Sequence, residues 1–177
     1  MNSNDPFELL LDMEHRVLTS AAGLPSTQDG DKWIGVAFRI GEDRLIAAMS
    51  EVKEILELPN FTTVPGVKSW VVGVANVRGS LLPIMDLKGF LLGEDIKQRR
   101  KGKVIVIDYK GFNTGLIVEE VYGMKHFMAN NEVTDLPHVH HAIAPYVNRA
   151  FVLDNVFWPV FNFEQITRNE KFAKASL

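Results

Sequence analysis

The sequence contains no cysteine, which excludes disulfide bonds, thiol nucleophiles and cysteine-ligated zinc. It has no apolar run close to the roughly 18 residues that a membrane-spanning helix needs. It also lacks a strong excess of one charge, since a formal charge of -3 gives no overall attraction to nucleic acid. Residues 1–5 contain no basic stretch that leads into an apolar one. We therefore expect no secretory signal and a cytoplasmic location.

Familiar catalytic motifs are missing as well. No Walker loop, dinucleotide-binding glycine fingerprint, nucleophile elbow or HExxH helix occurs in the sequence. Glu119 and Glu120 are adjacent, but neighbours on a strand point to opposite faces and so do not form an acid–base pair. We predict that the protein is not an enzyme and that it uses no cofactor.

The sequence does contain many short runs rich in valine, isoleucine and aromatic residues, bounded by turn residues. No long helical period separates them, which argues against a parallel sheet with crossover helices. Many short strands in so short a chain are typical of barrels, so we predict an all-β fold. A C-terminal helix is predicted over residues 162–172. The predicted strands are 33–40, 44–49, 71–77, 81–85, 103–109, 115–121, 150–153 and 156–161.

The N-terminal segment, residues 1–25, is predicted to form an amphipathic helix. Asp5 supplies an N-cap, Pro6 occupies the first helical position, and Pro25 follows the end of the apolar pattern. Its apolar stripe would pack on the rest of the chain, on a partner protein or on a membrane surface. The polar face is poor in lysine, which disfavours the membrane. A polar linker, residues 26–32, follows.

Two parts of the sequence echo each other. Residues 81–84 (LLPI) match residues 157–160 (FWPV), and the turn 78–79 matches the turn 154–155 at the same offset. A looser echo relates Glu51-Val52 to Glu120-Val121. Either the chain is a two-lobe duplication or two apolar hairpins are similar by chance.

Two clusters contain residue types that are typical of other kinds of site. The run Lys97–Lys103 is basic but contains no aromatic residue, so we favour a solvated loop or a contact with an acidic protein over nucleic acid. His138, His140 and His141 are possible metal ligands, but flanking prolines and the lack of cysteine favour a solvated loop. A nucleic-acid-binding barrel and a small-ligand or metal-binding barrel stay open as alternatives.

The most informative segment is residues 66–90, GVKSWVVGVANVRGSLLPIMDLKGF. Arg78 lies in a tight turn between two apolar strands, so its guanidinium, with five donors in a rigid fork, must point outward. Glu54 is a possible ion-pair partner. The alternative is an ordinary turn arginine without a function.

This segment resembles the signature of the chemotaxis adaptor family typified by CheW. The resemblance covers residues 33–166. Within the family it is greatest to the adaptors of type IV pilus twitching systems, because of the N-terminal helix and the sequences around Trp70 and residues 124–127. The matching motifs are Gly73-Val74, Asn76-Val77-Arg78-Gly79, Leu82-Pro83-Ile84, Asp86-Leu87, Val52-Lys53-Glu54-Ile55, Gly115-Leu116-Ile117-Val118 and Glu120-Val121.

The resemblance implies two SH3-like five-stranded β-barrel lobes within residues 33–170, with a helix at each end of the chain. Lobe 1 would consist of about 33–86 with 148–170, and lobe 2 of about 87–147. It also implies a non-enzymatic adaptor that couples methyl-accepting chemoreceptors to a CheA-type histidine kinase. Such an adaptor works in the cytoplasm, held at membrane-bound receptor arrays through its partners.

Seven residues are implied to face the receptor or the kinase, or to lie near such positions. Glu54 and Arg78 are the expected ion pair among them. In the second lobe Asp154-Asn155 stands where the first has arginine and glycine, so only the first hairpin would carry the arginine contact. The seven residues are Val52, Glu54, Gly73, Asn76, Arg78, Gly79 and Val121.

Deletion of residues 1–24 is predicted to lower the melting temperature by several degrees, because the rest of the chain would lose the apolar stripe that packs on it. Thermal unfolding of the full-length and truncated chains, followed by circular dichroism, measures the difference. An unchanged melting temperature would assign the stripe to a partner instead.

Overall fold

The computed structural model describes residues 32–94, 101–136 and 138–175. The predicted N-terminal helix, its linker up to residue 31 and the basic residues 97–100 lie outside these described residues. Within the described part of the chain, no helix is long and apolar enough to cross a membrane.

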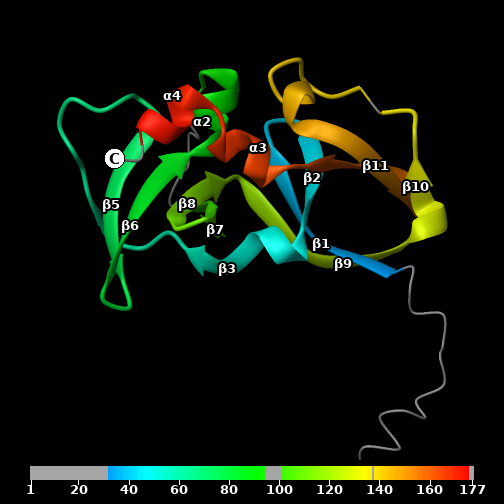
Figure 1. The fold of residues 1–177 in the computed structure, drawn as a ribbon, viewed down its shortest axis with the longest axis horizontal. Helices are drawn as coiled ribbons and strands as arrows, with labels where there is room; N and C mark the ends of the chain where they lie inside the picture. Colours follow the sequence, from blue (N-terminus) through cyan, green and yellow to red (C-terminus); the bar gives the residue numbers. More distant parts are fainter. Residues whose placement is uncertain (1–31, 95–100, 137, 176–177) are drawn as a thin grey trace, which may run out of the picture. The chain divides into compact units, whose positions relative to one another are not determined.

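Twelve strands form two sheets, and the all-β fold class is confirmed (Figure 1). Each sheet has five strands of six to nine residues and one edge strand of two. The first sheet contains, in order, β10 (Glu132–Val133), β11 (Val147–Leu153), β12 (Val156–Phe161), β2 (Asp43–Ala48), β1 (Lys32–Ile40) and β9 (Glu120–Met128). The second contains β3 (Val52–Glu57), β7 (Lys103–Tyr109), β8 (Phe112–Val118), β6 (Ser80–Asp86), β5 (Val71–Val77) and β4 (Phe61–Thr62).

The two sheets share one topology. In each, a central hairpin, β1–β2 or β7–β8, has an edge strand on one side and a second hairpin docked in parallel on the other. The parallel contacts occur at Ile46 with Val160 in the first sheet and at Ile84 with Gly115 in the second. Ile84 and Val160 are also matched in the sequence echo, so the echo corresponds to a repeated arrangement of strands.

The first half of the chain, β1–β6, and the second half, β7–β12, each supply strands to both sheets. This corrects the predicted lobe boundaries. The lobes were expected at 33–86 with 148–170 and at 87–147. Instead β3–β6 pair with β7 and β8, whereas β9 and β10 join β1 and β11. The reason is long-range hydrogen bonding, because β3 pairs with β7 and β9 pairs with β1 across the halves.

Three short α-helices complete the described fold. The C-terminal helix predicted over 162–172 is two helices, because Asn169 interrupts it and caps the second through the backbone N–H of Lys171. Asn162 caps the preceding helix, and the buried carboxylate of Asp86 caps the helix that follows β6. The helices are α2 (Leu87–Leu92), α3 (Phe163–Thr167) and α4 (Glu170–Lys174).

The largest core lies between the two sheets and is closed by α3. Phe38 of β1 stacks on Phe163 of α3, with ring centroids 5.7 Å apart, and meets Phe161 edge-on. Ile105 and Leu116 reach the same cluster from the second sheet. Each such buried side chain contributes about 1.5–3 kcal/mol. This shared core therefore holds the two sheets together.

A chain cut between Glu94 and Lys101 is predicted to stay assembled, because each half supplies strands to both sheets. Residues 95–100 would be replaced by a protease recognition sequence and cleaved after folding. The fragments should elute together at the volume of the intact protein and unfold in one transition. Separation of the fragments in native buffer would contradict the strand exchange.

Candidate functional site

The β5–β6 hairpin ends in a two-residue turn at Arg78 and Gly79. Both have positive φ, 51° and 84°, and Val77 pairs with Ser80, as in a type I′ turn. The Asn76 side chain accepts a hydrogen bond of 3.0 Å from the backbone N–H of Gly79. Asn76 and Gly79 therefore shape the turn, while the Arg78 side chain, 77% exposed, stands at its tip.

Arg78 and Glu54 form the ion pair that the sequence suggested. Arg78 Nη1 lies 2.8 Å from Glu54 Oε2, which reaches the hairpin from β3 and is 23% exposed. Exposed ion pairs contribute about 0–1 kcal/mol. The pair therefore orients the guanidinium more than it stabilises the fold.

Gly73 has a structural role inside the same sheet. A Cβ at this buried position would lie 2.3 Å from the carbonyl oxygen of Thr62 and 3.0 Å from the Phe61 ring. The absence of a side chain lets β4 pack closely against β5. Gly73 thus allows β4 to lie against the β5–β6 hairpin.

Val52 and Val121 occupy equivalent places in the two sheets. Val52 begins β3 directly after the short η2 helix (Met49–Glu51), and Val121 is the second residue of β9, which begins directly after Glu119, the residue that links β8 to β9. Val52 is 7% exposed, Val121 is half-buried, and both pack against the core between the sheets. The structure therefore unites Glu54 with Arg78 and places the two valines where the chain passes between sheets.

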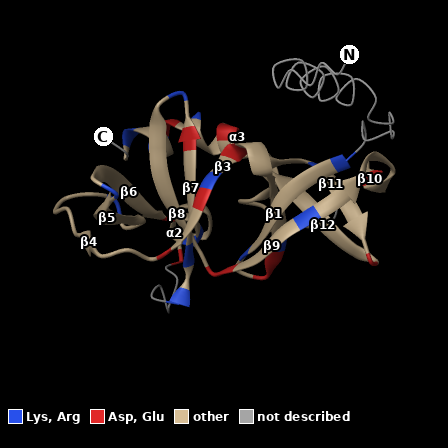
Figure 2. Cartoon of the chain, turned by 90° about the horizontal axis from the view of Figure 1, so that it is seen from below, with Lys and Arg blue, Asp and Glu red and all other residues tan. Residues whose placement is uncertain are grey.

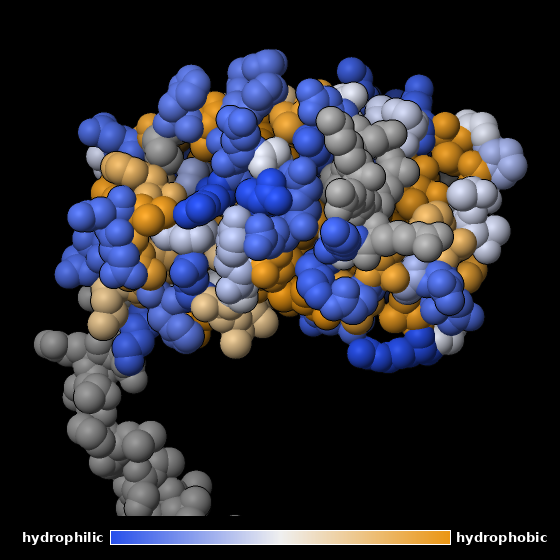
Figure 3. All heavy atoms as spheres, turned by 180° about the vertical axis from the view of Figure 1, so that it is seen from behind, coloured by the Kyte–Doolittle hydropathy of each residue, from blue (hydrophilic) through white to orange (hydrophobic). Residues whose placement is uncertain are grey.

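Sequence reasoning missed the exposed apolar residues near these positions. Leu81 is 74% exposed and pairs with Asn76 beside the hairpin tip. Ile34, Met124 and Met128, exposed by 39%, 62% and 49%, form what we term the β1–β9 apolar face, because strand register puts them on one side of the sheet. Figure 3 shows apolar atoms reaching the surface between hydrophilic ones. The apolar residues at 124 and 128 were the available signal, but polar His126 between them breaks the alternation expected of one strand face.

Charged groups of both signs are interspersed over the described strands and helices (Figure 2). One hydrogen bond connects η2 to α3: the Glu51 carboxylate accepts a 3.1 Å hydrogen bond from the backbone N–H of Glu164. Burial raises the pKa of Glu51, whereas the hydrogen bond from the Tyr109 hydroxyl lowers the pKa of Glu164. These contacts hold α3 against the segment that precedes Val52.

The histidine segment lies beside a cavity of about 610 Å³ that His138, His140 and His141 help to line. The backbone N–H of His140 donates to Asp43 Oδ2 at 3.1 Å. Among the described residues, no group of three or more histidine, cysteine or acidic side chains is arranged to hold a metal ion.

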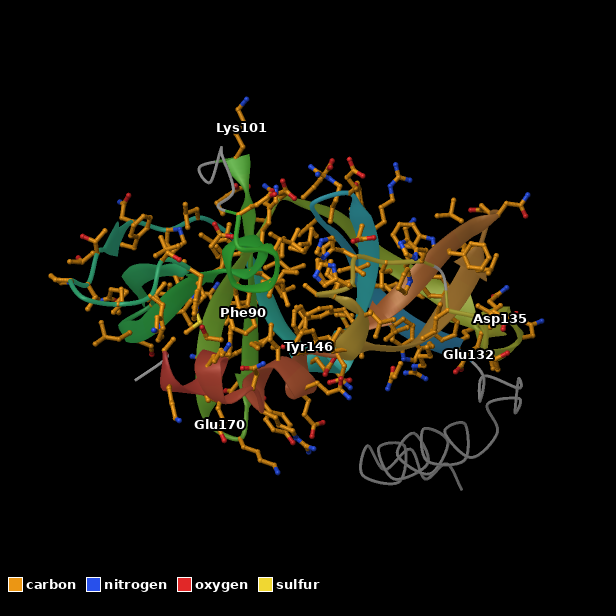
Figure 4. All side chains as sticks on the ribbon, turned by 90° about the horizontal axis from the view of Figure 1, so that it is seen from above. Phe90, Lys101, Glu132, Asp135, Tyr146 and Glu170 are labelled. Atoms are coloured by element: carbon orange, nitrogen blue, oxygen red, sulfur yellow. The ribbon has the colours of Figure 1, made fainter. Side chains whose placement is uncertain are left out.

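Three residues of the predicted basic run are described. Lys101 points away from the sheets into solvent (Figure 4), and Lys103 forms an ion pair with Glu57. Gly102 is buried at the start of β7. These three residues form no continuous basic patch.

A model of the CheW-like domain matches residues 35–171. The chain belongs to the CheW-like domain family. It is 42% identical over 168 residues to Protein PilI of Pseudomonas aeruginosa, which covers 94% of each chain. It is 31% identical over 91 residues to Chemotaxis protein CheW of Bacillus subtilis, which covers 51% of this chain and 57% of that protein.

A solved structure supports the CheW-like fold. The scaffolding protein TtCheW from Thermoanaerobacter tengcongensis superposes with a TM-score of 0.64 at 21% identity, over 74% of this chain and 89% of that one. At this identity the similarity shows the fold alone. The resemblance that the hairpin motifs indicated is confirmed at the level of the family by the domain match and by the identity to PilI.

Substitution of Gly73 by alanine is predicted to lower the free energy of unfolding by about 1–3 kcal/mol, because the added Cβ overlaps the backbone of β4. Urea unfolding measures the loss. Gly79→Ala is the matched control, since its Cβ meets no atom within 4 Å and only its positive φ is unfavourable. A loss at Gly73 no larger than at Gly79 would contradict the packing role.

Proposed function

We propose that this protein is a non-enzymatic adaptor that couples methyl-accepting chemoreceptors to a CheA-type histidine kinase. The signalling system is the one that controls type IV pilus twitching. Support comes from the 42% identity to PilI over 94% of both chains and from the CheW-like domain. The adaptor acts in the cytoplasm, at membrane-bound receptor arrays that it reaches through its partners.

The observation that carries this proposal is the exposed tip of the β5–β6 hairpin. Arg78 presents a rigid fork of donors that suits a carboxylate on a partner, and its ion pair with Glu54 holds the fork in place. The exposed Leu81 adds an apolar anchor beside it. Arginine and buried apolar anchors are typical of the few residues that dominate binding at protein interfaces.

An adaptor must hold two partners, and the chain offers a second exposed face. The β1–β9 apolar face lies on the first sheet, whereas the Arg78 hairpin belongs to the second. Its two methionines are flexible and polarizable, which suits a surface that adapts to another protein. Each partner is expected to bury about 1,200–2,000 Å² in total, the usual size of a specific interface.

Arg78→Glu is predicted to weaken binding of the kinase or the receptor fragment about thirtyfold, equivalent to a hot-spot loss of about 2 kcal/mol. The exposed position leaves the fold intact. Titration calorimetry with the purified kinase regulatory domain and with a receptor signalling fragment measures both affinities.

The double variant Glu54→Lys with Arg78→Glu is the matched control. It restores an internal ion pair with reversed charges, so it should match the wild-type melting temperature and still bind weakly. Normal binding by both variants would refute the role of Arg78 in partner recognition.

A further inference from the structure

Among the described residues, the chain passes between the two sheets at two short segments. Met49–Glu51 joins β2 to β3, and Glu119 alone joins β8 to β9. A single linking residue leaves little chain to absorb a change of angle between the sheets. The side chain of Glu119 therefore occupies a mechanically sensitive position.

Glu119 binds the β1–β2 turn of the first sheet and the α2 helix that follows β6 of the second. Its Oε2 accepts a hydrogen bond from the backbone N–H of Gly41, in the β1–β2 turn of the first sheet, and lies 3.6 Å from Arg39 Nη1. Its Oε1 lies 3.5 Å from Nζ of Lys88, in the α2 helix that follows β6 of the second sheet. The backbone N–H of Glu119 also donates to the Arg39 carbonyl oxygen at 3.3 Å. One carboxylate thus bridges the two sheets where the chain crosses.

The cations around Glu119 are themselves held in place. Arg39 donates a 2.7 Å hydrogen bond to the Gly41 carbonyl oxygen and lies 3.4 Å from the Glu120 carboxylate. The side chains of Lys88 and Glu119 are 14% and 18% exposed. At this burial salt screens the charges less than at an open surface, and an unpaired charge is costly.

We propose that Glu119 is a positioning residue for docking: its carboxylate fixes the angle between the sheets and so the relative placement of the partner-binding residues. The inference rests on the proposed function. Glu54 and Arg78 belong to the second sheet, whereas Val121 and Met124 belong to the first. The complete complex, with one partner at the hairpin of the second sheet and the other at the β1–β9 apolar face of the first, requires one relative orientation of the sheets. If only a fraction of the molecules has that orientation, the apparent dissociation constant equals the intrinsic one divided by that fraction.

The test uses Glu119→Gln in the full-length chain. Glutamine keeps the size of the side chain and an oxygen that accepts from the Gly41 N–H, but it removes the ion pairs with Lys88 and Arg39. The matched control is Glu57→Gln, because Glu57 pairs with Lys103 inside the second sheet and does not join the sheets. If Glu119→Gln does not fold, Lys88→Met removes the Lys88–Glu119 ion pair from the other side, together with the more exposed Lys88–Glu94 pair.

Two measurements are made on each variant. Because the sequence has no cysteine, Asp108→Cys on β7 and Asn148→Cys on β11 provide unique sites for spin labels, one in each sheet. Glu119→Gln should broaden the distance distribution between the labels and weaken binding of the kinase domain to the chain saturated with receptor fragment at least threefold. Glu57→Gln should change neither.

The possible results separate the two proposals. An unchanged distance distribution in Glu119→Gln overturns the positioning role, and so does a broadened distribution with wild-type affinity. A wild-type chain that binds neither the kinase domain nor the receptor fragment refutes the proposed function. In that case a broadened distribution would still show that Glu119 sets the angle between the sheets, while its role in docking would be refuted.

Discussion

The pairing of β3 with β7 and of β9 with β1 is the constraint on which the rest of the structure depends. Through these pairs each half of the chain completes the other half's sheet. The largest core therefore forms between the sheets, with Phe38 and Phe161 from one side and Ile105 and Leu116 from the other. Each sheet also encloses a smaller apolar cluster of its own, around Phe127 in the first and Ile84 in the second, and the shared core joins the two sheets into one unit.

The same topology decides where functional residues lie. β3 and β9 are edge strands, and each begins immediately after the chain crosses between sheets. Edge strands present one free side to solvent, which makes them natural sites for contact with another protein. β3 supplies Glu54 to the Arg78 hairpin, and β9 supplies the methionines of the β1–β9 apolar face. Both candidate faces are thus consequences of strand order.

Polar contacts brace each crossing. Glu51 accepts from the N–H of Glu164 and ties the first crossing to α3, although burial raises the pKa of its carboxyl group. Glu119 binds Gly41 and Lys88 at the second. Partly buried carboxylates are expensive to desolvate and persist where hydrogen bonds and cations compensate them. Both carboxylates thus stabilise the segments through which the chain passes between the sheets.

Local patterns were enough to predict the all-β class, the turn chemistry of the Arg78 hairpin and the family, whereas the pairing of Arg78 with Glu54 was implied only by the family resemblance. That β3 and β9 are complete strands, and which sheet each one joins, was evident only from the fold. Ile55 and Met124 face solvent on these strands, so the polar and apolar alternation that marks a half-buried strand is obscured. The cluster around Glu119 was equally hidden, because Arg39, Gly41 and Lys88 meet it only through long-range strand pairing. Local sequence preference decides which residues form strands and turns, whereas hydrogen bonding between strands distant in the sequence decides which strands become neighbours.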